Sequence, residues 1–203
     1  MNIAVFASGR GTNFSSIARA AKKGLIKAQI ALLVCDNPKA GVILRAKRAG
    51  IRTVLIKRED FADKYKFEGK ISEVIKENNI ELIVLAGFMR MLSPDFVVKY
   101  RNKIINVHPA LLPAFKGTQA IKDAFDYGVK VTGVTVHFVD ELMDSGPVIL
   151  QQAVKIEETD TLHTLEQKIH KIEHKLYPQA IQLYVEGKLK LEGRKVKISA
   201  QNL

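Results

Sequence analysis

NIAVFASGRGTN, residues 2–13, joins a short apolar run, two closely spaced glycines and the start of a helical pattern. Residues 2–7 are apolar enough for a buried strand, and residues 12–23 place Ile17 and Ala21 on one helical face. A strand that passes through a glycine turn into a helix is typical of the first unit of a parallel α/β sheet. This stretch therefore predicts an α/β protein.

The same alternation continues along the chain, which predicts one domain over residues 1–203. We expect further strands at residues 28–35, 52–56, 80–85 and 103–107, and helices at residues 41–49, 59–78, 95–99 and 120–127. The later part differs, with β-rich runs that can pair antiparallel (131–139 and 147–156), a long helix (161–185) and a lysine-rich hairpin (188–198). The pattern predicts a mostly parallel sheet with helices on both faces.

The composition is that of an ordinary globular protein with a basic surface. The chain has 203 residues, 47% hydrophobic and 26% charged, which excludes bulk disorder, collagen-like sequence and a disulfide scaffold. Its single cysteine, Cys35, lies in an apolar run, and no run is long enough to span a membrane, so we expect a reducing, cytoplasmic location. The net charge of +11 favours acidic ligands. A nucleic-acid-binding module is the alternative, but the basic residues form no stripe with aromatic residues.

The glycine turn at residues 8–13 is the first candidate site. Gly9 and Gly11 let the backbone approach a ligand, Thr12 or Asn13 can cap the helix, and free amides at a helix start bind anions. The turn lacks a third glycine and a following Gly-Lys, so it is neither a dinucleotide fingerprint nor a P-loop. It is either a site for a single phosphate or a tight structural turn.

A second candidate lies at a strand end, residues 104–109. Asn106 and His108 alternate with Val107, so both project to one side, and Pro109 keeps His108 extended. An amide and a protonated imidazole are two donors that suit a developing oxyanion. A purely structural role for this pair is the alternative.

Residues 140–147 form an acidic loop that ends at Gly-Pro. A carboxylate near His108 would favour the imidazolium. The residues alone do not choose between Asp140, Glu141 and Asp144, and a solvated hairpin loop is the alternative.

The remaining histidines and one apolar turn carry weaker signals. We predict that His137, in an alternating strand, is a packed residue. His170 and His174 are one helical turn apart, but no metal motif accompanies them, and we predict no metal site. Residues 86–92 form either core or the wall of a pocket for a flat heterocycle.

Several long motifs resemble those of the folate-dependent formyltransferases. They are NVHPALLP (106–113) with FKG (115–117), GVTVHFVDE (133–141) with DSGP (144–147), SGRGTN (8–13), LAGFMR (85–90), and Glu173-His174 with Tyr177-Pro178. The resemblance covers the whole chain. It implies a Rossmann-like formyltransferase fold with an antiparallel C-terminal extension.

The resemblance also implies an activity. The chain would transfer the formyl group of 10-formyltetrahydrofolate to the amine of glycinamide ribonucleotide in purine synthesis, with no metal and no covalent enzyme intermediate. The implied catalytic residues are Asn106, His108 and Asp144, and the implied substrate-binding residues are Gly11, Thr12, Asn13 and Glu173. The implied folate-binding residues are Lys64, Met89, Arg90, Met91, Leu92, Asn106, Asp140 and Asp144. His170 stands where relatives carry Lys or another residue, so the resemblance gives it no role.

Two formyl-handling relatives are alternatives within the same chemistry. Methionyl-tRNA formyltransferase would need a C-terminal tRNA-binding domain, and formyltetrahydrofolate hydrolase an N-terminal regulatory domain. The single expected domain accommodates neither. We expect small-molecule partners, no nucleic acid and no membrane, and leave a homodimer open.

Overall fold

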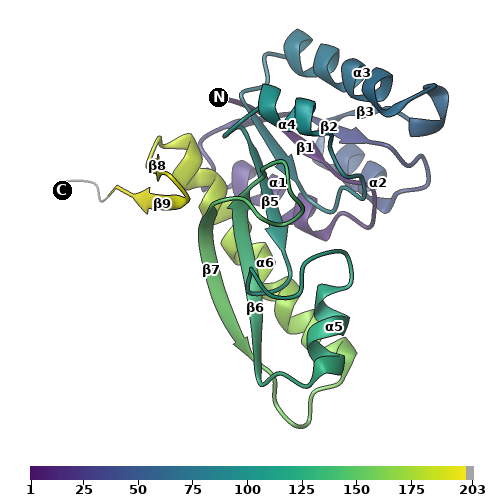
Figure 1. The fold of residues 1–203 in the computed structure, drawn as a ribbon. Helices are drawn as coiled ribbons and strands as arrows, with labels where there is room; N and C mark the ends of the chain where they lie inside the picture. The colour runs from purple at the N-terminus through teal and green to yellow at the C-terminus, as the bar shows by residue number, and fades with distance from the viewer. Residues whose placement is uncertain (200–203) are drawn as a thin grey trace.

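The computed structural model describes residues 1–199 and shows a seven-stranded sheet with helices on its two faces (Figure 1). The elements in chain order are β1 (Asn2–Phe6), α1 (Thr12–Lys22), β2 (Gln29–Cys35), α2 (Gly41–Ala49), β3 (Arg52–Leu55), the 3-10 helix η1 (Arg58–Asp60), α3 (Lys64–Glu77), β4 (Leu82–Leu85), α4 (Pro94–Lys99), β5 (Ile104–His108), α5 (Ala120–Tyr127), β6 (Val131–Phe138), β7 (Val148–Lys155), α6 (Leu162–Val185), β8 (Leu189–Glu192) and β9 (Lys195–Ile198). Apart from the start of α3, these are the elements that the sequence predicts, with small shifts at their ends.

The sheet has the strand order β3-β2-β1-β4-β5-β6-β7. The strands from β3 to β5 are parallel, whereas β6 pairs antiparallel with β5 and β7 pairs antiparallel with β6. The prediction of a mostly parallel sheet with an antiparallel extension is confirmed. The chain runs outward from β1 to β3 and returns to β4 on the other side of β1. Such a switch point opens a crevice beyond the carboxyl ends of the strands.

Alternate strand residues form the two hydrophobic layers. In β1, Ile3 and Val5 belong to the layer beneath α1, α2 and α6, whereas Ala4 and Phe6 belong to the layer beneath α3 and α4. The helices that follow β1 and β4 therefore pack on opposite faces, as the crevice requires. None of the helices described here is long and apolar enough to cross a membrane.

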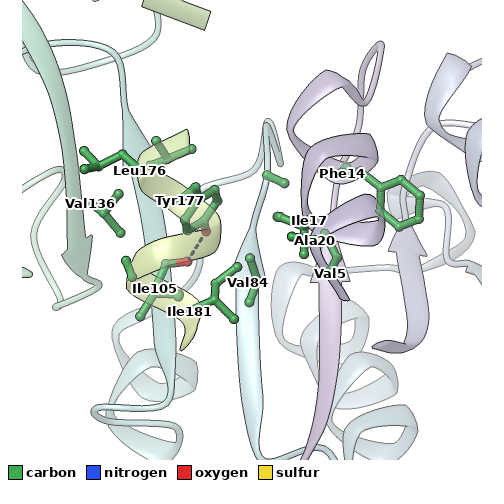
Figure 2. Packing of buried hydrophobic residues seen from close by; sticks show 14 of the residues in the cluster. Val5, Phe14, Ile17, Ala20, Val84, Ile105, Val136, Leu176, Tyr177 and Ile181 are labelled. Carbon is green, nitrogen blue, oxygen red and sulfur yellow. Dashed lines mark hydrogen bonds between the residues drawn. The ribbon is translucent and has the colours of Figure 1, made fainter. Parts of the chain in front are cut away.

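Helix α6 is attached to the centre of the sheet through Tyr177 (Figure 2). The Tyr177 side chain is fully buried, and its hydroxyl lies 2.9 Å from the backbone oxygens of both Leu85 in β4 and Ile105 in β5. Burial raises the pKa of Tyr177 well above its ordinary value, so the hydroxyl keeps its proton and donates it. This contact fixes the position of Glu173, one turn earlier on the same helix.

The prediction of a single helix over residues 59–78 is wrong at the N-terminal end. The structure has η1 there, and the longer helix α3 begins only at Lys64. Asp63 is extended, with φ −143°, and its carboxylate accepts a hydrogen bond from the amide of Lys66 at 2.7 Å. An N-cap of this kind starts a helix locally, whatever charged residues precede it.

The tail forms the predicted antiparallel hairpin of β8 and β9, a separate two-stranded sheet whose Leu189, Leu191 and Val196 pack against the main core (Figure 1). Its turn contacts the acidic loop, because Arg194 donates a hydrogen bond from Nη2 to the backbone oxygen of Ser145 at 2.5 Å. The last described segment therefore lies against the loop that carries Asp144.

Candidate active site

A large cavity of about 820 Å³ lies beyond the carboxyl ends of β1, β4 and β5. This is where ligands bind in open α/β sheets. Of the residues expected to act, its lining includes Gly11, Thr12, Asn13, Met89, Arg90, Met91, Leu92, Asn106, His108, Asp140, Asp144 and Glu173. Segments far apart in the sequence therefore meet at one site.

The segment between β1 and α1 presents backbone amides to this cavity. Gly11 precedes the first helical residue with φ +78°, and a Cβ there would lie 2.5 Å from Cγ2 of Val42. Only glycine satisfies both conditions. Thr12 and Asn13 lie inside the first turn, so the expectation that one of them caps the helix is wrong. No described side chain caps this turn, and its free amides are suited to an anion.

Glu173 joins this segment to α6. Its side chain is 5% exposed, and its Oε2 accepts hydrogen bonds from Nδ2 of Asn13 and from Nδ1 of His170, each at 3.0 Å. The hydrogen bond from Glu173 raises the pKa of His170, while burial and the positive charge of Arg10 act in the opposite direction. The buried carboxylate of Glu173 thus holds the His170 ring beside the backbone amides of residues 11–13, which we call the anion segment.

His108 is positioned through both ring nitrogens. Nε2 lies 2.7 Å from the backbone oxygen of Phe115, and this nitrogen carries a proton because a carbonyl oxygen only accepts. Nδ1 faces Oδ2 of Asp144 at 3.5 Å. At that separation Nδ1 makes no short hydrogen bond to Asp144, so this ring nitrogen remains available to a ligand.

Asp144 is the carboxylate of the acidic loop that reaches His108. The amide of Gly117 donates a hydrogen bond to its Oδ2 at 2.8 Å, and Asp144 has φ +46°, a left-handed conformation that is uncommon for residues other than glycine. Asp140 accepts a hydrogen bond from the loop's own backbone, and Glu141 pairs with an arginine outside the loop. Of the three acidic residues that the sequence left open, Asp144 is therefore the one that lies beside His108.

His137 completes this cluster. It is buried, as the sequence predicts, and it stands directly opposite Asn106 in the antiparallel pair of β5 and β6. Its Nδ1 lies 2.7 Å from the backbone oxygen of Phe138 and so carries a proton, while Nε2 lies 3.3 Å from Nδ2 of Asn106 and 3.8 Å from Oδ1 of Asp144. Burial lowers the pKa of His137, so the neutral ring accepts one hydrogen of the Asn106 amide. The second amide hydrogen remains for a ligand.

Three contributions to the site were missed by sequence reasoning: the backbone oxygen of Phe115, the backbone amide of Gly117, and the contact of His137 with Asn106. The motif FKG at residues 115–117 was the available signal. Gly117 has φ +97° and Phe115 has φ +50°, which turn their peptide groups toward the site.

Residues 86–92 were expected to form either core or the wall of a pocket, and in the structure they line the large cavity. Met89, Met91 and Leu92 line the large cavity; the two methionines are more than half exposed and Leu92 is buried. Arg90 is held by Asp36, whose Oδ2 lies 2.6 Å from Nε of the arginine. The cavity therefore has an apolar side with one fixed cation.

Lys64 is the one expected site residue that does not line the large cavity. It lines a neighbouring cavity of about 200 Å³ with Arg58. Arg90, Met91 and Leu92 line both cavities. Lys64 therefore shares a cavity with three of the folate-binding residues that the resemblance implies, Arg90, Met91 and Leu92.

His170 and His174 are stacked, with ring centroids 6.4 Å apart and an interplanar angle of 15°. Over residues 1–199, no group of three or more His, Cys, Asp or Glu residues is arranged to hold a metal ion. The two rings form a stacked pair on one face of α6.

The formyl transferase family model matches residues 1–181 of this chain. The chain belongs to the formyl transferase family. A relative of this formyl transferase, the phosphoribosylglycinamide formyltransferase of Bacillus subtilis (strain 168), is 50% identical over 178 residues, which are 88% of this chain and 91% of the relative. The family and the formyltransferase class expected from the sequence are confirmed.

This formyl transferase also resembles one part of a longer protein and the whole of a solved structure. The trifunctional purine biosynthetic protein adenosine-3 of Gallus gallus is 43% identical over 189 residues, which are 92% of this chain but only 19% of that protein. The crystal structure of glycinamide ribonucleotide transformylase 1 from Symbiobacterium toebii matches with a TM-score of 0.96 at 38% identity, covering 98% of this chain and 94% of that one. The formyl transferase fold therefore extends over nearly the whole chain.

Proposed function

We propose that this formyl transferase moves the formyl group of 10-formyltetrahydrofolate to the amine of N1-(5-phospho-D-ribosyl)glycinamide, in the synthesis of purine nucleotides. The observation that carries the proposal is that one cavity holds both an anion segment at residues 11–13 and a donor cluster of Asn106, His108 and Asp144. The first suits the phosphate of a ribonucleotide, and the second suits a reaction in which an oxygen becomes negative. The names of the bacterial relatives support this substrate.

The shape of the cavity supports two substrates at once. Its volume of about 820 Å³ is in the upper range for small-molecule sites. The apolar wall formed by Met89, Met91 and Leu92 suits the flat pterin ring, and the carboxylate of Glu173, which lines the same cavity, would accept hydrogen bonds from ribose hydroxyls. The proposed acyl donor and acceptor would then meet at Asn106 and His108.

The proposed reaction begins with a neutral amine, which an α-amino pKa of about 8 supplies near neutral pH. The amine nitrogen forms a bond to the formyl carbon, and the formyl oxygen takes the negative charge. The free amide hydrogen of Asn106 and the Nδ1 hydrogen of His108 donate to that oxygen. Both donors are fixed before substrate binds, so they stabilise the tetrahedral intermediate without reorganisation.

Asp144 has two tasks in this proposal. Its carboxylate, 3.5 Å from Nδ1 of His108, stabilises the imidazolium. It also accepts the proton of the attacking nitrogen, directly or through a water molecule, and returns it to the folate nitrogen as the bond from that nitrogen to the formyl carbon breaks. Each protein group ends the cycle as it began.

The test is formyl transfer from 10-formyltetrahydrofolate to glycinamide ribonucleotide, with the unphosphorylated glycinamide riboside as control. We expect transfer to the ribonucleotide, a KM at least about tenfold higher for the riboside, and a kcat lowered about 10²–10³-fold in Asn106→Ala. Failure to formylate the ribonucleotide would overturn the proposal. Equal use of the riboside would remove the phosphate site from it.

A further inference from the structure

We propose that Glu68 is a positioning residue for the folate: it fixes residues 89–92, which we call the wall segment, against which the folate would bind. Glu68 lies on α3, it does not line the large cavity, and none of the sequence motifs includes it. The inference rests on the proposed function, because the folate of that proposal is the ligand that the wall segment receives. It adds a residue that acts on one of two substrates without touching either.

The wall segment has little packing to hold it in place. Arg90, Met91 and Leu92 line both the large cavity of about 820 Å³ and the smaller cavity of about 200 Å³, so this stretch of chain separates two hollows. Of the four residues in the segment, only Leu92 is buried. A segment with few buried apolar contacts depends on its hydrogen bonds for a fixed position.

Glu68 supplies hydrogen bonds at the C-terminal end of the wall segment. The side chain of Glu68 is buried, and its Oε1 accepts a hydrogen bond from the amide of Ser93 at 2.7 Å. Its Oε2 accepts a second hydrogen bond from the hydroxyl of Ser93. A carboxylate that binds the backbone and the side chain of one residue makes two charge-assisted hydrogen bonds to it. Because Ser93 directly follows Leu92, the end of the wall segment is fixed to α3.

Two other buried acceptors hold the first half of the wall segment. Oγ of Ser8, which follows β1, accepts a hydrogen bond from the amide of Met89 at 3.0 Å. Oδ2 of Asp36, which follows β2, lies 2.6 Å from Nε of Arg90. Ser8 also belongs to the glycine turn at residues 8–13, so its removal would disturb both substrates. Glu68 is therefore the acceptor whose removal tests the wall segment alone.

A role in helix capping alone makes a different prediction. Ser93 is the N-cap of α4, and its Oγ accepts a hydrogen bond from the amide of Phe96 at 3.2 Å. If Glu68 only stabilised this cap, its loss would lower the free energy of unfolding and leave the affinity for both substrates unchanged. If Glu68 fixes the wall segment, its loss weakens folate binding and leaves the affinity for the ribonucleotide unchanged, because the anion segment belongs to a different loop.

The experiment measures kcat, the KM for 10-formyltetrahydrofolate and the KM for glycinamide ribonucleotide in wild type, Glu68→Ala, Glu68→Gln and Glu73→Gln. We expect Glu68→Ala to raise the KM for the folate at least about tenfold, as for lost hydrogen bonds to a charged group, with an unchanged KM for the ribonucleotide. Glu68→Gln keeps an acceptor for the amide of Ser93 and offers a donor to its hydroxyl, so it should restore most of the lost affinity. Glu73→Gln makes the same substitution at an exposed ion pair of the same helix, with Lys70, and should match wild type.

Two further measurements separate a folding defect from a positioning effect. Urea unfolding reports the stability of each variant, and calorimetric titration with tetrahydrofolate, the expected product, reports the wall segment without turnover. Tetrahydrofolate should bind at least about tenfold more weakly to Glu68→Ala. Ser93→Ala removes only the hydroxyl bond and should raise the KM for the folate by a smaller factor, which provides the same test if Glu68→Ala does not fold.

The outcomes are distinct. A lower free energy of unfolding with unchanged folate affinity, or an equal rise in both KM values, would overturn the inference. Weaker tetrahydrofolate binding in Glu68→Ala, in a chain that does not formylate the ribonucleotide, would instead overturn the proposed function and support the role of Glu68.

Discussion

Replacing Gly11 by alanine tests the anion segment directly. Gly11 has φ +78°, and an added Cβ would lie 2.5 Å from Cγ2, 2.6 Å from Cβ and 2.9 Å from Cα of Val42. The contact with Cα is a backbone contact that no rotamer of Val42 can relieve. Gly11→Ala must therefore move the start of α1 away from α2.

The cost can be assembled from two terms. An alanine in the left-handed region costs about 1–2 kcal/mol, and inserting a methyl group into a packed contact costs about 1–3 kcal/mol. We expect Gly11→Ala to lower the free energy of unfolding by about 2–5 kcal/mol. In the proposed function these amides bind the phosphate and do not contact the reacting atoms, so their displacement should raise the KM for the ribonucleotide more than it lowers kcat.

Gly9 provides the matched control in the same turn. Nothing lies within 4 Å of an added Cβ at Gly9, and its φ is not in the left-handed range. Urea unfolding and steady-state kinetics of Gly9→Ala and Gly11→Ala should therefore differ clearly. Equal stability and equal KM in the two variants would refute this account of the segment.

Three further results are expected. Asp144→Asn keeps an acceptor for the amide of Gly117 but removes the charge, so kcat should fall about 10²–10⁴-fold; near-normal turnover in the transfer assay would exclude Asp144 from proton transfer. Tyr177→Phe leaves two strand carbonyls without their donor and should lower the free energy of unfolding by about 1–3 kcal/mol, with an unchanged KM; full stability in urea would show that the hydroxyl contributes nothing. Hydrogen bonds, first that from Lys168, lower the pKa of Asp160 from 3.8 to about 2, so its stabilising effect is complete above 3.8 and is lost as pH falls toward 2; Asp160→Asn should therefore unfold with a weaker pH dependence in this range, and an unchanged acid profile would contradict the pairing.

The fold could be predicted because burial leaves a direct trace in the sequence. The continuous apolar run at residues 3–6 corresponds to a strand buried on both faces, and the apolar stripes of the helices correspond to the two layers that cover it. The start of α3 was mispredicted for a local reason, since the cap at Asp63 outweighs the helical propensity of residues 59–62. The hydrophobic pattern indicates which side of a helix faces the core, but it does not indicate the residue at which the helix begins.

The site could be predicted only in part, because the sequence shows which side chains are present but not which backbone amides and carbonyls will face a cavity. Asn106 and His108 were placed on one side of a strand from spacing alone, and the structure brings both to the cavity. The opposition of His137 and Asn106 depends on the register between β5 and β6, which the residues do not specify. The carbonyl of Phe115 and the amide of Gly117 depend on left-handed backbone conformations that become visible only in the fold.

In the proposed mechanism, these missed backbone groups hold the side chains of the cluster in position. His108 is held by the Phe115 carbonyl, Asp144 by the Gly117 amide and His137 by the carbonyl of Phe138, so each polar side chain has one hydrogen bond to the rigid frame. His137 then takes one hydrogen of the Asn106 amide. In the proposed reaction, the second amide hydrogen of Asn106 and Nδ1 of His108 are the groups left to bind the formyl oxygen. Because donors of fixed orientation stabilise charge without reorganisation, the proposed oxyanion site depends as much on the peptide groups of residues 115–117 as on the side chains that would touch the substrate.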